Sequence, residues 1–177
     1  RRNGSCRSSK RHPGVISRGY GGRARRATRV REGDDPRRVG DEPLLIAEAS
    51  GAPVVVARRR IHAVRLIETL PEVDVILADD GLQHYALARD VEILVIDGRR
   101  RWGNGRVLPA GPLRDPPERA DACDFRVVNG GTAGEGEVPM QLLPDDARRL
   151  HDDARIPLAQ FADGALHAVA GIGDPER

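Results

Sequence analysis

The stretch VDVILADDGLQHY (Val73–Tyr85) joins a mostly apolar run to a group of polar side chains. Its first half is typical of a strand buried within a sheet. The run ends in two adjacent aspartates, Asp79 and Asp80, followed by a glycine, an amide and an imidazole. Because ligands of open α/β sheets bind at the carboxyl ends of the strands, the pattern predicts a functional site where this strand ends.

Similar apolar runs alternate with helical patterns along the chain. They do not alternate between apolar and polar residues as a half-exposed strand does. Such continuous apolar runs are typical of parallel strands buried on both faces. The sequence therefore predicts an α/β fold, a mostly parallel sheet with helices on both faces. Strands are expected at 14–17, 53–57, 73–78, 91–97, 125–129 and 167–172, an edge strand at 138–144, and helices at 41–51, 58–70 and 116–122.

The segments between these elements are predicted to be loops. Residues 23–40 are charged and irregular, and residues 130–136 are rich in glycine, so both are expected to be exposed loops. The helix at 58–70 carries apolar residues at helical spacing and is expected to end before Pro71. Residues 1–12 are polar, basic and without period, which predicts a disordered or non-native start.

Composition bounds the class of protein. A chain of 177 residues with 39% hydrophobic and 32% charged residues is long enough for one domain with a core. The net charge is only +2 and aromatic residues make up 3%, which argues against an arginine-rich nucleic-acid binder. Two distant cysteines indicate a reducing compartment. We find no apolar run near the roughly 20 residues of a membrane span.

An apolar strand ending in aspartate matches the arrangement that holds Mg²⁺ near a nucleotide phosphate. Two adjacent carboxylates repel each other unless a cation neutralises them, which favours a metal at Asp79 and Asp80. The alternative is that Asp79 caps a turn and Asp80 is solvated. A second candidate is Asp41 in VGDEPL, which from the sequence alone is read as a helix N-cap with Pro43 in the first turn.

Five motifs occur in an order that resembles one family. GVISRGYGG (14–22), VGDEPLLIA (39–47), ADDGLQHYALARDVEILVIDG (78–98), WGNGRVLPAGPLRD (102–115) and VAGIGDPER (169–177) closely resemble tetraacyldisaccharide 4'-kinases, the lipid A kinases of Gram-negative bacteria. The likeness covers residues 13–177 and implies a P-loop NTPase-like fold, here truncated at both ends. We therefore interpret residues 13–177 as a partial kinase domain.

The resemblance also implies a reaction and a location. These kinases transfer the γ-phosphate of ATP, with Mg²⁺, to the 4' hydroxyl of a tetraacyldisaccharide 1-phosphate, the lipid A disaccharide precursor. They do so at the cytoplasmic face of the inner membrane, and a monomer without a nucleic-acid partner is expected. A different class remains open, namely a non-catalytic α/β module that binds a phosphorylated ligand.

The resemblance assigns roles residue by residue. Asp41 is expected to be the base and Asp80 the metal carboxylate, with Asp79 as its partner. Asp115 stands where the family usually has glutamate, and Arg18 and His84 also have purely structural readings. The substrate-binding residues implied are Arg18, Tyr20, Glu42, Gln83, His84, Asn104, Arg114 and Asp115.

The phosphate-binding loop of the family is missing from this sequence. No G-x-x-x-x-G-K-[ST] motif occurs, and the only lysine, Lys10, is followed by Arg11. The family's N-terminal hydrophobic segment and the segment that follows VAGIGDPER are missing as well. No nucleotide-contacting residue can therefore be assigned, and the sequence resembles a central, inactive fragment of the kinase.

We predict that the 177-residue chain by itself does not transfer phosphate from ATP. Losing one set of oriented donors commonly costs about 10²–10³-fold in rate, and here the loop and its lysine are both missing. The measurement is phosphorylation of the lipid precursor by the purified chain. Robust product formation would contradict the prediction.

Overall fold

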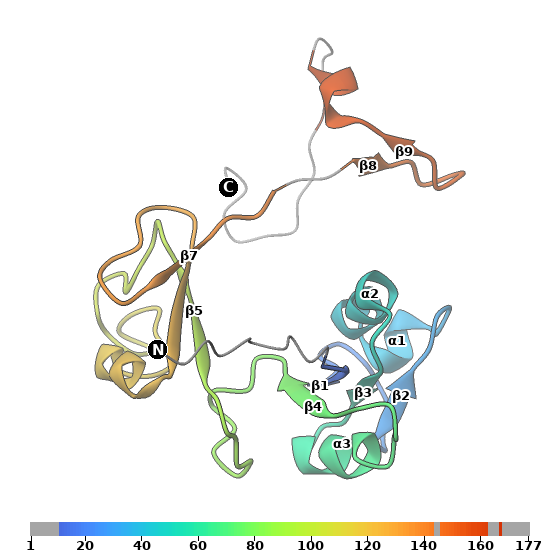
Figure 1. Ribbon diagram of the computed structural model, residues 1–177, viewed down its shortest axis with the longest axis horizontal. Helices are drawn as coiled ribbons and strands as arrows, with labels where there is room; N and C mark the ends of the chain where they lie inside the picture. Colours follow the sequence, from blue (N-terminus) through green and yellow to red (C-terminus); the bar gives the residue numbers. More distant parts are fainter. Residues whose placement is uncertain (1–10, 144–145, 163–166, 168–177) are drawn as a thin grey trace, which may run out of the picture. The chain divides into compact units, whose positions relative to one another are not determined.

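The computed structural model describes residues 11–143, 146–162 and 167. The chain divides into two compact units between Glu92 and Ile93, and each unit has its own sheet (Figure 1). Among the described residues, we find no helix that combines the length and the apolar character needed to cross a membrane.

The first unit is built on a four-stranded sheet in the order β2-β3-β1-β4. β1 lies between β3 and β4 and runs parallel to both, while the short β2 runs antiparallel to β3. The carboxyl ends of the three parallel strands therefore meet at one edge of the sheet. The strands are β1 (Pro13–Ser17), β2 (Thr28–Val30), β3 (Val54–Val56) and β4 (Val75–Ala78).

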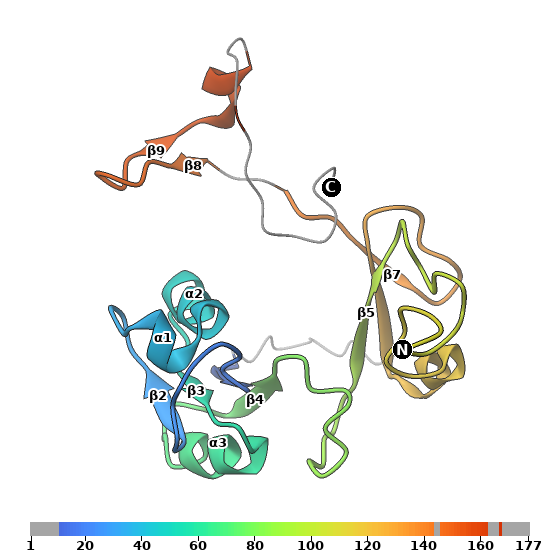
Figure 2. The ribbon, with the colours of Figure 1, turned by 180° about the vertical axis from the view of Figure 1, so that it is seen from behind.

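Helices cover both faces of this sheet (Figure 2). α1 (Pro36–Val39) and α2 (Asp41–Ser50) pack on one face, and α3 (Arg60–Ile67) packs on the other. Successive strand residues point to opposite faces, so Val15 joins the first core and Ile16 the second. The predicted α/β class is confirmed, and the fully buried β3 shows the expected burial on both faces.

Three predictions for the first unit are wrong. Residues 23–40 are not a continuous loop, because β2 and α1 form within them; the Asp35 side chain caps α1 by accepting from the Arg37 N–H. The helix expected at 58–70 ends at Ile67. β4 is an edge strand of its sheet rather than a central one, and since it has a neighbour on one side only, Leu77 is 50% exposed.

The second unit holds a three-stranded parallel sheet in the order β5-β6-β7, so the segment at 138–144 supplies the edge strand that was predicted. A single 3-10 helix, η1, replaces the helix expected at 116–122. The strand predicted at 167–172 lies outside the described residues apart from His167. The elements are β5 (Ile93–Asp97), η1 (Pro117–Ala122), β6 (Phe125–Asn129), β7 (Val138–Met140), an antiparallel pair β8 (Ala147–Arg148) and β9 (Arg155–Ile156), and the 3-10 helix η2 (Leu158–Phe161).

A two-pronged ion pair joins two loops of this unit. Arg101 donates to both carboxylate oxygens of Glu137, at 2.8 and 2.9 Å. These hydrogen bonds, with a further one from the Gly134 N–H, lower the pKa of the Glu137 carboxyl to about 2. A lowered carboxyl pKa contributes stability above the unfolded value of 4.5, and that stability is lost as the pH falls toward 2.

We predict that the Glu137 carboxyl titrates with a midpoint near 2 when followed by NMR. Arg101→Gln should return the midpoint toward 4.5, because both side-chain hydrogen bonds are lost. Arg126→Gln is the matched control: Arg126 acts on Glu137 only through its charge, so its loss should raise the midpoint less. A Glu137 midpoint that is unchanged in Arg101→Gln would contradict the assignment.

Candidate functional site at the end of β4

The acidic pair follows the last residue of β4. The Asp79 N–H donates to the Ile16 carbonyl at 3.0 Å, which continues the pairing of β4 with β1 by one residue. The Ser17 Oγ, at the end of β1, donates to Asp79 Oδ2 at 3.0 Å. Asp79 is therefore held half-buried against the neighbouring strand, while Asp80 is exposed.

A buried arginine holds the turn that carries this pair. Arg60 is only 9% exposed, and its Nη2 donates to the Asp79 carbonyl and, at 3.1 Å, to the Asp80 carbonyl. Asp80 has φ +50°, a left-handed conformation that is uncommon for a residue with a side chain. The guanidinium thus fixes the backbone at the point where the strand gives way to the acidic turn.

The amino end of α2 brings two more carboxylates. Gly40, with φ +95°, occupies the N-cap position, and Asp41 is the first residue of the helix. The reading of Asp41 as the N-cap is therefore wrong; its Oδ1 accepts from the Glu42 N–H at 3.0 Å instead. A Cβ on Gly40 would come within 2.8 Å of the Tyr20 carbonyl, so glycine lets the helix start directly against the 18–22 loop.

Three of these carboxylates act on the fourth, Glu42. The pKa of the Glu42 carboxyl is raised, first by the charge of Asp79, then by burial, and then by the charges of Asp80 and Asp41. A raised carboxyl pKa means that stability is lost as the pH rises through that pKa, because all four groups then repel. A bound cation would relieve this repulsion.

Asp79 and Asp80 suit a hard cation that also binds water or phosphate oxygens. Among the described residues, no group of three or more His, Cys, Asp or Glu side chains is arranged to hold a metal ion. Mg²⁺, however, is usually bound through one or two carboxylates, with water and phosphate oxygens completing the shell. Asp79 and Asp80 fit that pattern.

The remaining candidates of the first unit surround the same sheet edge. Arg18 and Tyr20 lie on the glycine loop after β1, and Tyr20 is 86% exposed. Gln83 is exposed, and the half-buried His84 is held in a turn by its N–H, which donates to the Gly81 carbonyl at 2.9 Å. Within the described part of the chain, the imidazole of His84 makes no hydrogen bond.

The second unit contains the other three candidates. Asn104 uses its side chain to close its own loop: Nδ2 donates to the Ala110 carbonyl at 2.9 Å, and Oδ1 accepts from the Arg106 N–H at 3.1 Å. Arg114 is exposed and Asp115 half-buried. The local structure explains Asn104 as a loop residue, and the substrate roles of all three remain predictions.

A family model described as tetraacyldisaccharide-1-P 4'-kinase matches residues 4–177. The chain belongs to this kinase family. The match begins within the segment 1–12 and runs to the last residue of the sequence.

Relatives in the family share about half of their aligned residues with this chain. A tetraacyldisaccharide 4'-kinase of Aeromonas hydrophila is 53% identical over 166 residues, which cover 93% of this chain and 49% of the relative. The kinase of Chromobacterium violaceum is 54% identical over 172 residues, covering 93% and 50%. The chain therefore spans about half the length of the curated relatives that it matches.

A solved structure of the family shares the fold. The crystal structure of the "apo" form of LpxK from Aquifex aeolicus, in complex with ATP, aligns with a TM-score of 0.69 at 25% identity. The alignment covers 86% of this chain and 51% of that protein. This likeness confirms the predicted P-loop NTPase-like fold.

Sequence reasoning missed Ser17 and Arg60. A serine at a strand end carries little signal, because only the pairing of β1 with β4 brings it to Asp79. Arg60 had a detectable sign: a cation in the first turn of a helix is disfavoured by the helix dipole. Such a placement indicates a partner elsewhere in the fold, here the two carbonyl groups of the acidic turn.

We predict that Arg60→Met lowers the free energy of unfolding by about 2–4 kcal/mol, because two carbonyl groups lose a charged donor. Arg65→Met is the matched control, since Arg65 is exposed on the same helix and should change stability by less than about 0.5 kcal/mol. Chemical denaturation followed by circular dichroism measures both. Equal effects of the two changes would remove Arg60 from this role.

Proposed function

We propose that the protein to which this chain belongs transfers the γ-phosphate of ATP to the 4' hydroxyl of a tetraacyldisaccharide 1-phosphate. The observation that carries the proposal is the meeting of four carboxylates where β4 ends and α2 begins. Phosphoryl transfer needs a metal site and a proton acceptor side by side, and the two pairs of carboxylates can divide these tasks. The family membership and the ATP complex reported for LpxK support the same reaction.

Asp41 is the group proposed to accept the proton of the sugar hydroxyl. It is exposed at the first position of α2, so a substrate can reach it. The proton acceptor is assigned to Asp41 because of this accessible position at the start of α2.

Asp80 and Asp79 are the residues that would hold Mg²⁺. The ion would neutralise charge on the phosphate groups during transfer. Asp79 is oriented by Ser17, and the backbone of both aspartates is oriented by Arg60, so the pair is held in place before any ligand arrives. This rigidity supports a metal role over that of a solvated turn.

The remaining assignments complete the proposal. Substrate contacts are assigned to Arg18, Tyr20, Glu42, Gln83 and His84 of the first unit and to Asn104, Arg114 and Asp115 of the second. The proposed setting is the cytoplasmic face of the Gram-negative inner membrane, where the lipid A precursor is the partner and the protein acts as a monomer.

The test uses a completed chain, defined as this sequence joined to the segments of the Aeromonas hydrophila relative that lie outside the match. We predict that Asp41→Ala and Asp41→Asn both lower kcat by about 10²–10⁴-fold, the usual scale for losing a general base. Neither should change the KM for ATP much. Because Gly40 is the N-cap, melting temperatures should move little.

Asp80→Asn is the comparison that separates base from metal ligand. It should raise the Mg²⁺ concentration required for half-maximal rate, whereas the two Asp41 variants should leave that concentration unchanged. An Asp41→Asn enzyme with near-normal kcat would remove Asp41 from the mechanism. A completed chain that binds the phosphorylated lipid but never turns over ATP would instead support the non-catalytic binding module.

A further inference from the structure

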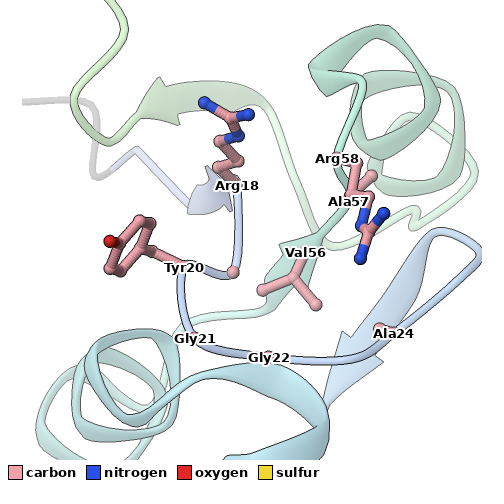
Figure 3. Close-up of a pocket in the computed structure, with 9 residues that line it drawn as sticks. Arg18, Tyr20, Gly21, Gly22, Ala24, Val56, Ala57 and Arg58 are labelled. Atoms are coloured by element: carbon pink, nitrogen blue, oxygen red, sulfur yellow. The ribbon is translucent and has the colours of Figure 1, made fainter.

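A cavity of about 270 Å³ opens on the first unit beside the glycine loop (Figure 3). Residues 18–22 form one wall, and the end of β3, from Val56 to Arg58, forms the other. β1 and β3 run parallel, with Ser17 opposite Val56, so Arg18 and Arg58 leave from neighbouring strand ends. This volume leaves enough room for a phosphate group.

The lining of this cavity carries positive charge without a counter-charge. Arg18 and Arg58 both line it and are exposed, and among the described residues no acidic side chain does so. Within the same part of the chain, neither guanidinium makes an ion pair or a hydrogen bond. Other arginines behave differently, since Arg29, Arg101 and Arg149 each pair with a carboxylate.

The loop between the two arginines lets a ligand approach the backbone. Gly19 has φ +68°, and a Cβ there would come within 2.9 Å of the Val39 carbonyl oxygen, so the loop is packed tightly against α1 on that side. A Cβ on Gly21, with φ +77°, would meet nothing within 4 Å. Figure 3 shows Arg58 extending from the end of β3 toward the part of the loop that holds Gly22 and Ala24.

We propose that this cavity binds a phosphate group, with Arg58 as its ligand. Guanidinium groups suit phosphate because they donate two parallel hydrogen bonds. The four carboxylates at β4 and α2 would repel a phosphate that is not shielded by a metal, whereas the cavity at β1 and β3 attracts one. The same sheet edge therefore offers an acidic end for a reacting hydroxyl and a basic end for an existing phosphate.

The proposed function indicates where such a phosphate would come from, and the inference rests on it in that respect. The family description names an acceptor that already carries a 1-phosphate. A cationic cavity would hold that group while the distant hydroxyl lies at the carboxylates. The nucleotide is the other possible source of phosphate, and the two sources predict different kinetic changes.

The test is Arg58→Gln in the completed chain, with the exposed Arg65→Gln as the matched control. With the 1-phosphorylated disaccharide, Arg58→Gln should raise the acceptor KM about 10- to 100-fold, the scale of a charged hydrogen bond, with little change in kcat. Arg58→Lys should recover part of the loss because it keeps the charge. With a disaccharide that lacks the 1-phosphate, the variant and parent should match.

The outcomes distinguish the acceptor 1-phosphate from a nucleotide phosphate, and failure of the cavity proposal from failure of the proposed kinase function. A rise confined to the KM for ATP would assign the cavity to a nucleotide phosphate, and unchanged constants for both substrates would overturn the proposal. If the parent has no kinase activity, calorimetric titration with glucose 1-phosphate still decides: weaker binding in Arg58→Gln but not in Arg65→Gln supports the cavity. Equal binding by all variants, or none by the parent, refutes it.

Discussion

The contact between Arg60 and the backbone of Asp79 and Asp80 is the constraint on which the candidate site depends. Four carboxylates at one sheet edge repel each other, and the raised pKa of Glu42 records that repulsion. Arg60 places a buried positive charge beside the turn and donates to the main-chain oxygens of Asp79 and Asp80. The backbone that carries the two aspartates is therefore fixed.

Using carbonyl groups as partners has a functional consequence. A guanidinium bonded directly to the Asp79 or Asp80 carboxylate would compete with a metal for the same oxygens. Here Asp79 instead accepts from the neutral Ser17 hydroxyl, which orients the carboxylate without cancelling its charge. A neutral donor thus orients the Asp79 carboxylate for a cation.

The same sheet edge carries two opposite electrostatic environments. Acidic side chains gather where β4 ends and α2 begins. Where β1 and β3 end, Arg18 and Arg58 flank the glycine loop, and neither pairs with a carboxylate within the described part of the chain. Ser17 and Arg18 are consecutive residues, yet one orients an aspartate and the other lines the cationic cavity. An acceptor with a phosphate at one end and a reactive hydroxyl at the other would match this division.

Several features of the first unit could be predicted from local sequence alone. The sequence predicts β1, β3 and α2 because apolar runs and helical patterns depend on a few neighbouring residues. The failures lie where distant segments decide. α1 and β2 gain their stability from packing and pairing with α2 and β3, which a charged, irregular sequence does not reveal.

By itself the sequence determined the α/β class, the acidic pair at the end of an apolar strand and the family resemblance, because each depends on residues that are contiguous in the chain. Only the tertiary structure decided the role of Arg60, the help that Ser17 gives Asp79, and the placing of Arg58 on the same cavity as Arg18. The residues in these three pairs are 19, 62 and 40 positions apart in the chain. Strand order and helix packing set such distances, and no local pattern encodes them.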